Sequence, residues 1–340
     1  MRSTPAQSHL YRGVLHMRIS GKVASVAGLF ALCALPALAQ QNVTVPVPAG
    51  KSPVWYAWTP KPKTLPSYGP NKPVTRLPEV LAAHKGQASW SADVVQTKRW
   101  SARWIQMAPG EKTRPQFWGD DRTLWVVWSG QIRFNIEGQQ PFVATKGFLV
   151  QVPYRVPYSM EAVGNEPALR FEVTHAGKLP SYPAAAADQP PPNPPGYHYV
   201  KVSYNGSHDG YNDANRPYID FMKDYVAAFP NGPNKSHLFA DDDDTLSDII
   251  RGMGVPTPPE TNRGHFHIGN DEFWFILEGK IDYLIEDVGL ITADPGDVVF
   301  VPPSRWHRAS WHAGQMDTRL SFNSRPTMLH AYAENANGTQ

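Results

Sequence analysis

This chain repeats itself at a separation of 149 residues, and the repeat constrains its fold more than any other feature. PQFWGDDRTLWVVWSGQI (115–132) aligns with GHFHIGNDEFWFILEGKI (264–281), with a phenylalanine and the last glycine coinciding. At the same shift, GFLVQVPYRVPY (147–158) aligns with GDVVFVPPSRWH (296–307). A self-similarity of this length predicts two copies of one domain in a single chain.

Both copies have the pattern of β-structure. Short runs rich in β-branched and aromatic residues are bounded by Gly, Pro or Asn, which is typical of strands joined by turns. The expected strands are 123–128, 131–136, 148–152 and 169–174 in the first copy, and 272–277, 280–286, 297–301 and 318–322 in the second. With 34 Pro and 26 Gly in 340 residues, long helices are disfavoured. We therefore expect an all-β fold with short linking helices, over 218–229 and 245–253.

The first 39 residues have the pattern of a secretory signal peptide. Scattered basic residues precede an apolar run over 23–35, and the small residues Ala37 and Ala39 precede the expected cleavage. The run is short for a bilayer of about 30 Å, so an N-terminal anchor is the less favoured alternative. The only cysteine, Cys33, lies in this run, so the mature chain can form no internal disulfide. A periplasmic or secreted bacterial location follows, with no membrane association after cleavage.

The remaining boundaries follow from composition and from the repeat. Pro180–Pro195 is Pro-rich, and such a stretch is extended. We expect an extended arm at 40–99, a first β-domain at 100–176, a Pro-rich linker with short helices at 177–253, a second β-domain at 254–326 and a tail at 327–340.

The charge balance argues against a nucleic-acid partner. Lys and Arg total 32 against 30 Asp and Glu, and the leader holds four of the basic residues and no acidic one. The mature chain is therefore close to neutral and has no excess of basic residues to neutralise phosphates. A small-molecule substrate is expected instead. Association with a second copy, wrapped by the arm, is an open alternative.

Histidines and one carboxylate gather in the second copy. His265 and His267 alternate across Phe266, Glu272 follows after four residues, and His307 comes after a later strand. Alternate residues of a strand share a face, so these side chains can converge. Three neutral imidazoles and a carboxylate suit a divalent transition metal. The alternative is that the histidines fill the domain interior or face solvent.

These residues resemble the two motifs of the cupin superfamily. HxH, four residues, Glu, six residues and Gly form the first, and Gly, five residues, Pro, four residues and His form the second. Residues 100–324 as a whole resemble a bicupin. The resemblance implies two double-stranded β-helix barrels in tandem, with the metal ligands at His265, His267, Glu272 and His307. Ser304 departs from the pattern, since a turn glycine is commoner there.

The first copy has a different set at the four ligand positions. Gln116, Trp118, Thr123 and Tyr158 stand where the second copy has its histidines and glutamate. This set does not suit a metal, so we expect the first barrel to be a degenerate cupin with a structural or dimerising role.

Three residues near the expected ligands are candidates for binding substrate. Arg263 can hold a carboxylate through a bidentate contact, or it can brace the barrel, because Arg114 stands at the same place in the first copy. Strand alternation points Trp274 and Trp311 inward, either as an aromatic lining for a flat ligand or as ordinary core.

The resemblance leaves the reaction open. We expect an exported metal-dependent oxidoreductase, a non-haem dioxygenase with Fe(II), that acts on a small carboxylated or phenolic compound. Glu272 would serve as a ligand or accept a proton. The alternatives are a Mn(II)-dependent decarboxylase or lyase and a non-catalytic bicupin that binds a small ligand. The spacing from Arg263 to His267 is similar to that of hydroxyanthranilate dioxygenases, while the ligand set is similar to that of bicupin oxalate decarboxylases.

Overall fold

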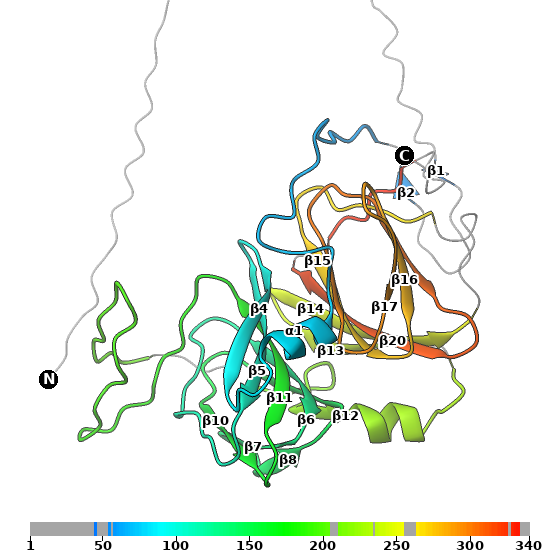
Figure 1. The fold of residues 1–340 in the computed structure, drawn as a ribbon. Helices are drawn as coiled ribbons and strands as arrows, with labels where there is room; N and C mark the ends of the chain where they lie inside the picture. Colours follow the sequence, from blue (N-terminus) through cyan, green and yellow to red (C-terminus); the bar gives the residue numbers. More distant parts are fainter. Residues whose placement is uncertain are drawn as a thin grey trace, which may run out of the picture. The chain divides into compact units, whose positions relative to one another are not determined.

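A computed structural model describes residues 57–204, 210–233, 235–254, 263–325 and 328–333, together with β1 (Thr44–Val45) and β2 (Val54–Trp55). Strands β1 and β2 pair antiparallel in a small unit of their own. The predicted signal peptide lies outside the described residues. Apart from α1 (Leu77–Ala83) and a short π-helix η1 (Met222–Ala227), the described regular structure is β, which confirms the predicted all-β class (Figure 1).

The N-terminal barrel is built from two antiparallel sheets. Its strands are β4 (Trp90–Gln96), β5 (Trp100–Met107), β6 (Thr123–Ser129), β7 (Gln131–Ile136), β8 (Phe142–Ala144), β9 (Phe148–Val152), β10 (Tyr158–Val163), β11 (Ala168–His175) and β12 (Tyr218–Asp220). The large sheet has the order β12-β9-β6-β11-β5-β4, and the small sheet has the order β10-β7-β8.

The C-terminal barrel has the same plan. Its strands are β3 (Val74–Thr75), β13 (Lys235–Asp241), β14 (Thr245–Met253), β15 (Glu272–Glu278), β16 (Ile281–Ile285), β17 (Gly289–Ala293), β18 (Val298–Val301), β19 (His307–Trp311) and β20 (Met316–Ser324). The large sheet has the order β13-β14-β20-β15-β18-β3, and the small sheet has the order β17-β16-β19. Two double-stranded β-helix barrels in tandem are therefore confirmed.

The two barrels match strand by strand at the shift seen in the sequence. Thr123 pairs with Val152 in the first barrel, and Glu272 pairs with Val301 in the second. The turn after β15 needs glycine, because Gly279 has φ +68° and an added Cβ would collide with the backbone of the 316–317 segment. The internal repeat is thus a repeat of strand register as well as of sequence.

Each barrel borrows an edge strand from the segment that precedes the other barrel. β3 comes before the N-terminal barrel in the chain but pairs with β18 of the C-terminal barrel. β12 comes before the C-terminal barrel but pairs with β9 of the N-terminal barrel. This reciprocal exchange covers an edge of each large sheet with chain from elsewhere.

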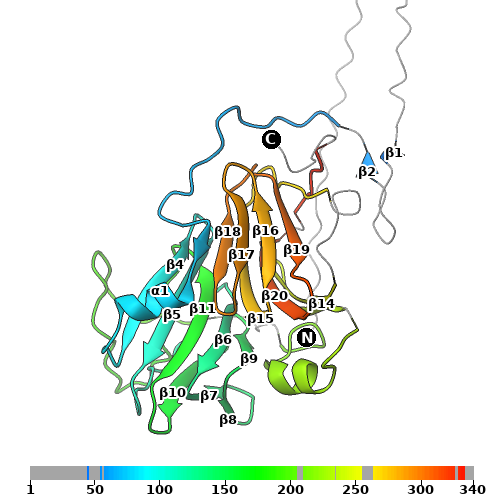
Figure 2. The same ribbon diagram turned by 45° about the vertical axis from the view of Figure 1, so that its right-hand side comes forward.

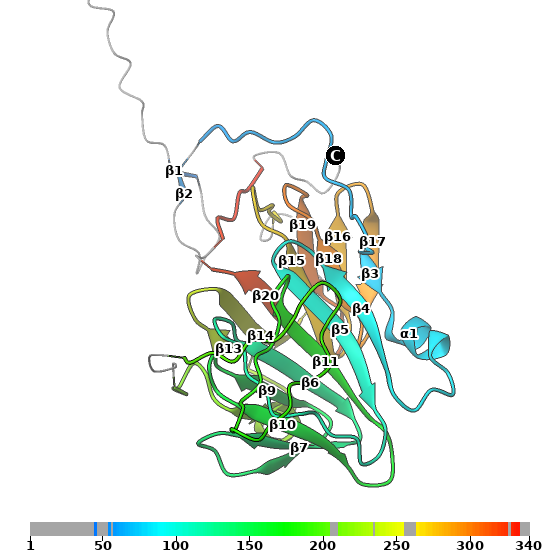
Figure 3. The ribbon, with the colours of Figure 1, turned by 90° about the vertical axis from the view of Figure 1, so that its left-hand side faces the viewer.

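A hydrophobic core joins the large sheets of the two barrels. In β15, Phe273 and Phe275 face this joint core, while Trp274 and Ile276 face the interior of their own barrel. The ring of Phe275 lies 4.9 Å from that of Phe171 in the first barrel. Figure 3 shows the large sheets of the two barrels beside one another. Both faces of the central strands are buried, so their side chains are apolar on each side.

Two helix predictions were wrong in part or in full. Thr245–Met253 is strand β14, with alternate residues buried and paired to β20 along its whole length. The predicted helix over 218–229 begins with β12, and only Met222–Ala227 is helical. Strands β13 and β14 therefore belong to the C-terminal barrel, although the sequence placed them in the linker.

The predicted arm is likewise partly structured. Its last segment, Trp90–Gln96, pairs with β5 and is an outer strand of the N-terminal barrel. In the part of the chain that the structure describes, no helix is long and apolar enough to cross a membrane.

Candidate metal centre

The four predicted ligands come together at one end of the C-terminal barrel. Glu272 is the first residue of β15, and His307 is the first residue of β19. The backbones of His265 and His307 exchange two hydrogen bonds of 2.9 Å, which place the histidine pair beside β19. His265 is partly buried, while His267, Glu272 and His307 are buried.

The distances within this group suit a single ion. One ligand atom from each of the four residues lies within 4.8 Å of the others. Nε2 of His267 is 2.9 Å from Oε2 of Glu272, and Nε2 of His307 is 3.3 Å from the same oxygen. Bonds from imidazole nitrogen or carboxylate oxygen to a transition metal are about 2 Å long, so one ion can bridge such a group.

Two of the imidazoles are held in the tautomer that a metal requires. Nδ1 of His267 lies 3.1 Å from the carbonyl oxygen of Leu329, and Nδ1 of His307 lies 3.0 Å from that of Arg305. A carbonyl can only accept, so each Nδ1–H donates and each Nε2 presents its lone pair to the centre. Nε2 of His265 is buried with no hydrogen-bond partner, which is costly unless an ion occupies the site.

The ionisation states also fit a metal. Burial raises the pKa of Glu272, but the contacts of its carboxylate with the imidazoles of His267 and His307 outweigh it and hold this pKa well below its ordinary value. Burial, reinforced by the charge of His307, lowers the pKa of His265 well below its usual range. Glu272 is thus an anion and His265 a neutral imidazole, the forms that bind cations.

Tyr158 occupies the corresponding place in the N-terminal barrel. Its phenol oxygen accepts hydrogen bonds from Nε2 of Gln116 at 2.9 Å and from Nε1 of Trp118 at 3.1 Å. Burial raises the pKa of Tyr158 far above its usual value, so the phenol stays protonated. Here three of the residues at the ligand positions form hydrogen bonds with one another, so a polar cluster around a hydroxyl fills this end of the barrel.

The structure brings one of the predicted substrate residues to the ligands. Trp274 is buried, and its ring centroid lies 5.3 Å from that of His307. Trp311 packs against the barrel core, with the guanidinium of Arg319 lying 5.4 Å from its ring centroid. Arg263 is half-buried, and its carbonyl oxygen accepts a hydrogen bond of 3.0 Å from Nε1 of Trp306. This contact is made by the backbone and not by the guanidinium, so the role of the Arg263 side chain stays a prediction.

Sequence reasoning missed the segment 328–333, part of the predicted tail. It crosses the histidine pair, because Phe266 and Ala331 exchange two backbone hydrogen bonds of 3.0 Å. The ring of His330 lies 4.4 Å from that of His265, and that of Tyr332 lies 6.1 Å from it. No periodic pattern marks this segment, so only the presence of a histidine there could have drawn attention to it.

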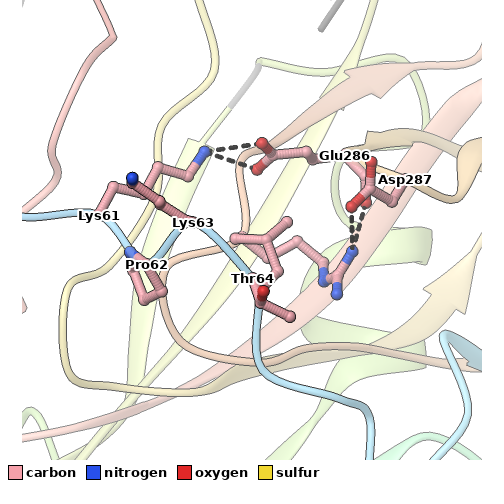
Figure 4. Close-up of a pocket in the computed structure, with 8 residues that line it drawn as sticks. Lys61, Pro62, Lys63, Thr64, Glu286 and Asp287 are labelled. Carbon is pink, nitrogen blue, oxygen red and sulfur yellow. Dashed lines mark hydrogen bonds and ion pairs between the residues drawn. The ribbon is translucent and has the colours of Figure 1, made fainter.

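The arm lies over the same end of the barrel and, with Glu286, Asp287 and Arg305, lines an open polar pocket of about 590 Å³. Nζ of Lys61 lies 2.8 and 2.7 Å from the two carboxylate oxygens of Glu286 (Figure 4). Glu286 also accepts a hydrogen bond of 2.8 Å from the backbone of Trp306, the residue before His307. Arg305 donates to the carbonyl of Pro66 at 3.1 Å. The arm is thus tied to the segment that carries a ligand.

Comparisons with known proteins agree with this fold. Residues 256–322 match the family model described as a cupin domain. A cupin 2 conserved barrel domain protein from Leptotrichia buccalis has a similar structure, with a TM-score of 0.50 and 11% identity over 74% of this chain and 96% of that one. Oxalate decarboxylase from Bacillus subtilis, a protein with Mn(II) centres, gives a TM-score of 0.44 and 14% identity over 72% of this chain and 75% of that one. No curated protein matches the chain.

The family match and the two barrels together define the class. Residues 256–322, in the C-terminal barrel, match a cupin domain, and the chain as a whole has a cupin-like fold. Its two barrels of this fold stand in tandem, which is the bicupin arrangement, and the C-terminal barrel holds a cluster that can bind a metal.

Proposed function

We propose that this bicupin is an exported, metal-dependent oxidoreductase, specifically a non-haem dioxygenase that acts on a small carboxylated or phenolic compound. The observation that carries the proposal is the convergence of three imidazoles and one carboxylate within 4.8 Å. Fe(II) is the first choice of metal and Mn(II) the second, because both accept this mixed nitrogen and oxygen set.

The ligand residues would hold the ion through Nε2 of His265, His267 and His307 and through the carboxylate of Glu272. A bound divalent ion would supply Lewis acidity and open positions for substrate or oxygen. The remaining chemistry belongs to the chain. Glu272 is buried and anionic, so its carboxylate could serve as a ligand or accept a proton from a bound substrate.

The substrate class follows from the surroundings of the ligands. Trp274 offers a buried aromatic ring beside His307, which suits a flat ligand. His330 and Tyr332 contribute polar groups on the exposed side. An aromatic ring and polar groups near the ligands favour a small compound that has a ring or planar body and an anionic or phenolic head.

A Mn(II)-dependent decarboxylase is the second candidate, favoured by the same ligand set. Oxygen uptake separates the two. The mature protein, loaded with Fe(II) or with Mn(II), is offered small phenols and carboxylic acids while dissolved oxygen and released carbon dioxide are followed. A dioxygenase consumes about one oxygen molecule per substrate, whereas a decarboxylase releases carbon dioxide without net consumption of oxygen. Absence of turnover with every compound would favour a non-catalytic binding protein.

Export is part of the proposal and has its own test. The motif at residues 1–39 predicts cleavage after Ala39 in a bacterial host. N-terminal sequencing of the protein recovered from the periplasm or medium is expected to begin at Gln40. Recovery of the full-length chain from the cytoplasm alone would contradict it.

A further inference from the structure

An additional histidine stands at the candidate metal centre, on a segment that belongs to neither sheet of the barrel. The backbone bridge between Phe266 and Ala331 fixes the segment 328–333 across the histidine pair. The carbonyl of Leu329 orients His267, and the next residue is His330. Figure 2 shows this segment, drawn in red after β20, at the end of the C-terminal barrel over which the blue arm also passes.

His330 lies on the side of the centre that faces solvent. Its ring centroid is 4.4 Å from that of His265 and 4.9 Å from that of His267, edge to face in both cases. The ligand histidines are buried or half-buried, while His330 is exposed. A small molecule that enters from this side therefore passes the His330 imidazole before it reaches the ligand atoms.

We propose that His330 is a substrate-positioning residue, which donates a hydrogen bond to the anionic group of a molecule bound at the open positions of the metal. The inference rests on the proposed function, because it presupposes an ion held by His265, His267, Glu272 and His307. An imidazole N–H that donates to a carboxylate or phenolate forms a charge-assisted bond, stronger than one between neutral groups. His330 is exposed to solvent and is not one of the four metal ligands, so it can contact a bound molecule and not the ion itself. The backbone bridge at Ala331 holds it in position.

The test uses Co(II) as the metal and azide as the anion. The mature full-length chain is loaded with Co(II), and azide binding is followed through the visible absorption of the ion. We expect His330→Ala to keep about one Co(II) per chain and to bind azide about tenfold more weakly, as expected for the loss of one hydrogen bond to a charged group. His330→Gln, which retains an N–H donor, is expected to recover part of the affinity. His198→Ala, at an exposed histidine outside the barrels, is the matched control.

The outcomes separate this inference from the proposed function. Unchanged azide affinity in His330→Ala would overturn the positioning role while leaving the metal site intact. Loss of Co(II) from that variant would also overturn it, because His330 would then be a ligand of the ion. A wild-type chain that takes up no Co(II) would contradict the proposed metal site itself and this inference with it.

Discussion

Tyr158 and His307 occupy the same place in the two barrels. Each begins its strand, and each pairs across the small sheet at the same register, Tyr158 with Ile136 and His307 with Ile285. In the N-terminal barrel this position holds a phenol that accepts two hydrogen bonds. In the C-terminal barrel it holds an imidazole whose Nε2 lies 3.3 Å from the carboxylate of Glu272. Together with the changes at the other three ligand positions, this exchange separates a hydrogen-bonded polar cluster from a group that can hold a metal.

Removing the Tyr158 hydroxyl should weaken the N-terminal barrel. Tyr158→Phe leaves the donors of Gln116 and Trp118 without their acceptor, at a cost of about 1–3 kcal/mol in the free energy of unfolding. Urea unfolding measures this loss, and the metal content should not change. Tyr197→Phe, at an exposed tyrosine, is the control. Equal stability of Tyr158→Phe and wild type would show that the phenol cluster does not stabilise the barrel.

Removing one imidazole should empty the metal centre. His307→Ala deletes a ligand and its hydrogen bond to the Arg305 carbonyl, so most of the bound metal should be lost on dialysis. Elemental analysis of the purified variants measures the content. His312→Ala provides the comparison, since its Nδ1 lies 3.0 Å from Asp282 instead of at the centre. Full metal content in His307→Ala would refute the assigned ligand set.

The glycine after β15 should tolerate no side chain. Gly279→Ala places a Cβ against the backbone of Met316 and the side chain of Asp317 at φ +68°, so we expect a loss of about 1–3 kcal/mol in the free energy of unfolding. Gly314→Ala separates the strain of a positive φ from the collision of the added Cβ. Gly314 also has a positive φ but has open space around it. A smaller loss for Gly314→Ala in thermal unfolding is expected, and equal losses would show that the collision is unimportant.

Acid should weaken the ion pairs of Asp121. Burial raises the pKa of Asp121, but the hydrogen bond and charge of His175, together with Lys178, outweigh it and lower this pKa below its ordinary value of 3.8. A lowered carboxyl pKa gives stability that is present above the ordinary value and is lost as pH falls through the folded value. Wild type should therefore exceed Asp121→Asn in unfolding free energy at about pH 6, and this difference should shrink towards about pH 3.

Urea unfolding across this range measures the difference. Asp120→Asn is the matched control, because its carboxylate is largely exposed and lies 3.4 Å from Arg155. A difference between wild type and Asp121→Asn that stays constant with pH would contradict the ionic origin of the effect.

The barrels and the ligand set were predictable because local pattern and tertiary structure agree there. The strands around Glu272 and His307 have β-rich sequences, and strand alternation alone places His265 and His267 on one face. Strand β14 was missed for a physical reason. Its buried face carries Ser247, which donates to a backbone carbonyl, and Arg251, which pairs with Glu278, so burial does not coincide with apolar character.

The rest of the site depends on contacts between distant parts of the chain. The exchange of β3 and β12 between barrels has no local signal, because each is only two or three residues long. His330 reaches the centre only because Ala331 pairs with Phe266, 65 residues earlier. Such pairings follow from the assembled fold and cannot be derived from periodicity.

The central claim is that three imidazoles and one carboxylate of the C-terminal barrel bind a single transition metal. Anomalous diffraction at the absorption edge of the metal present in crystals of the purified protein tests it most directly. We predict one peak at about 2 Å from Nε2 of His265, His267 and His307 and from the carboxylate of Glu272. A metal peak elsewhere, with no density among these four side chains, would contradict the account.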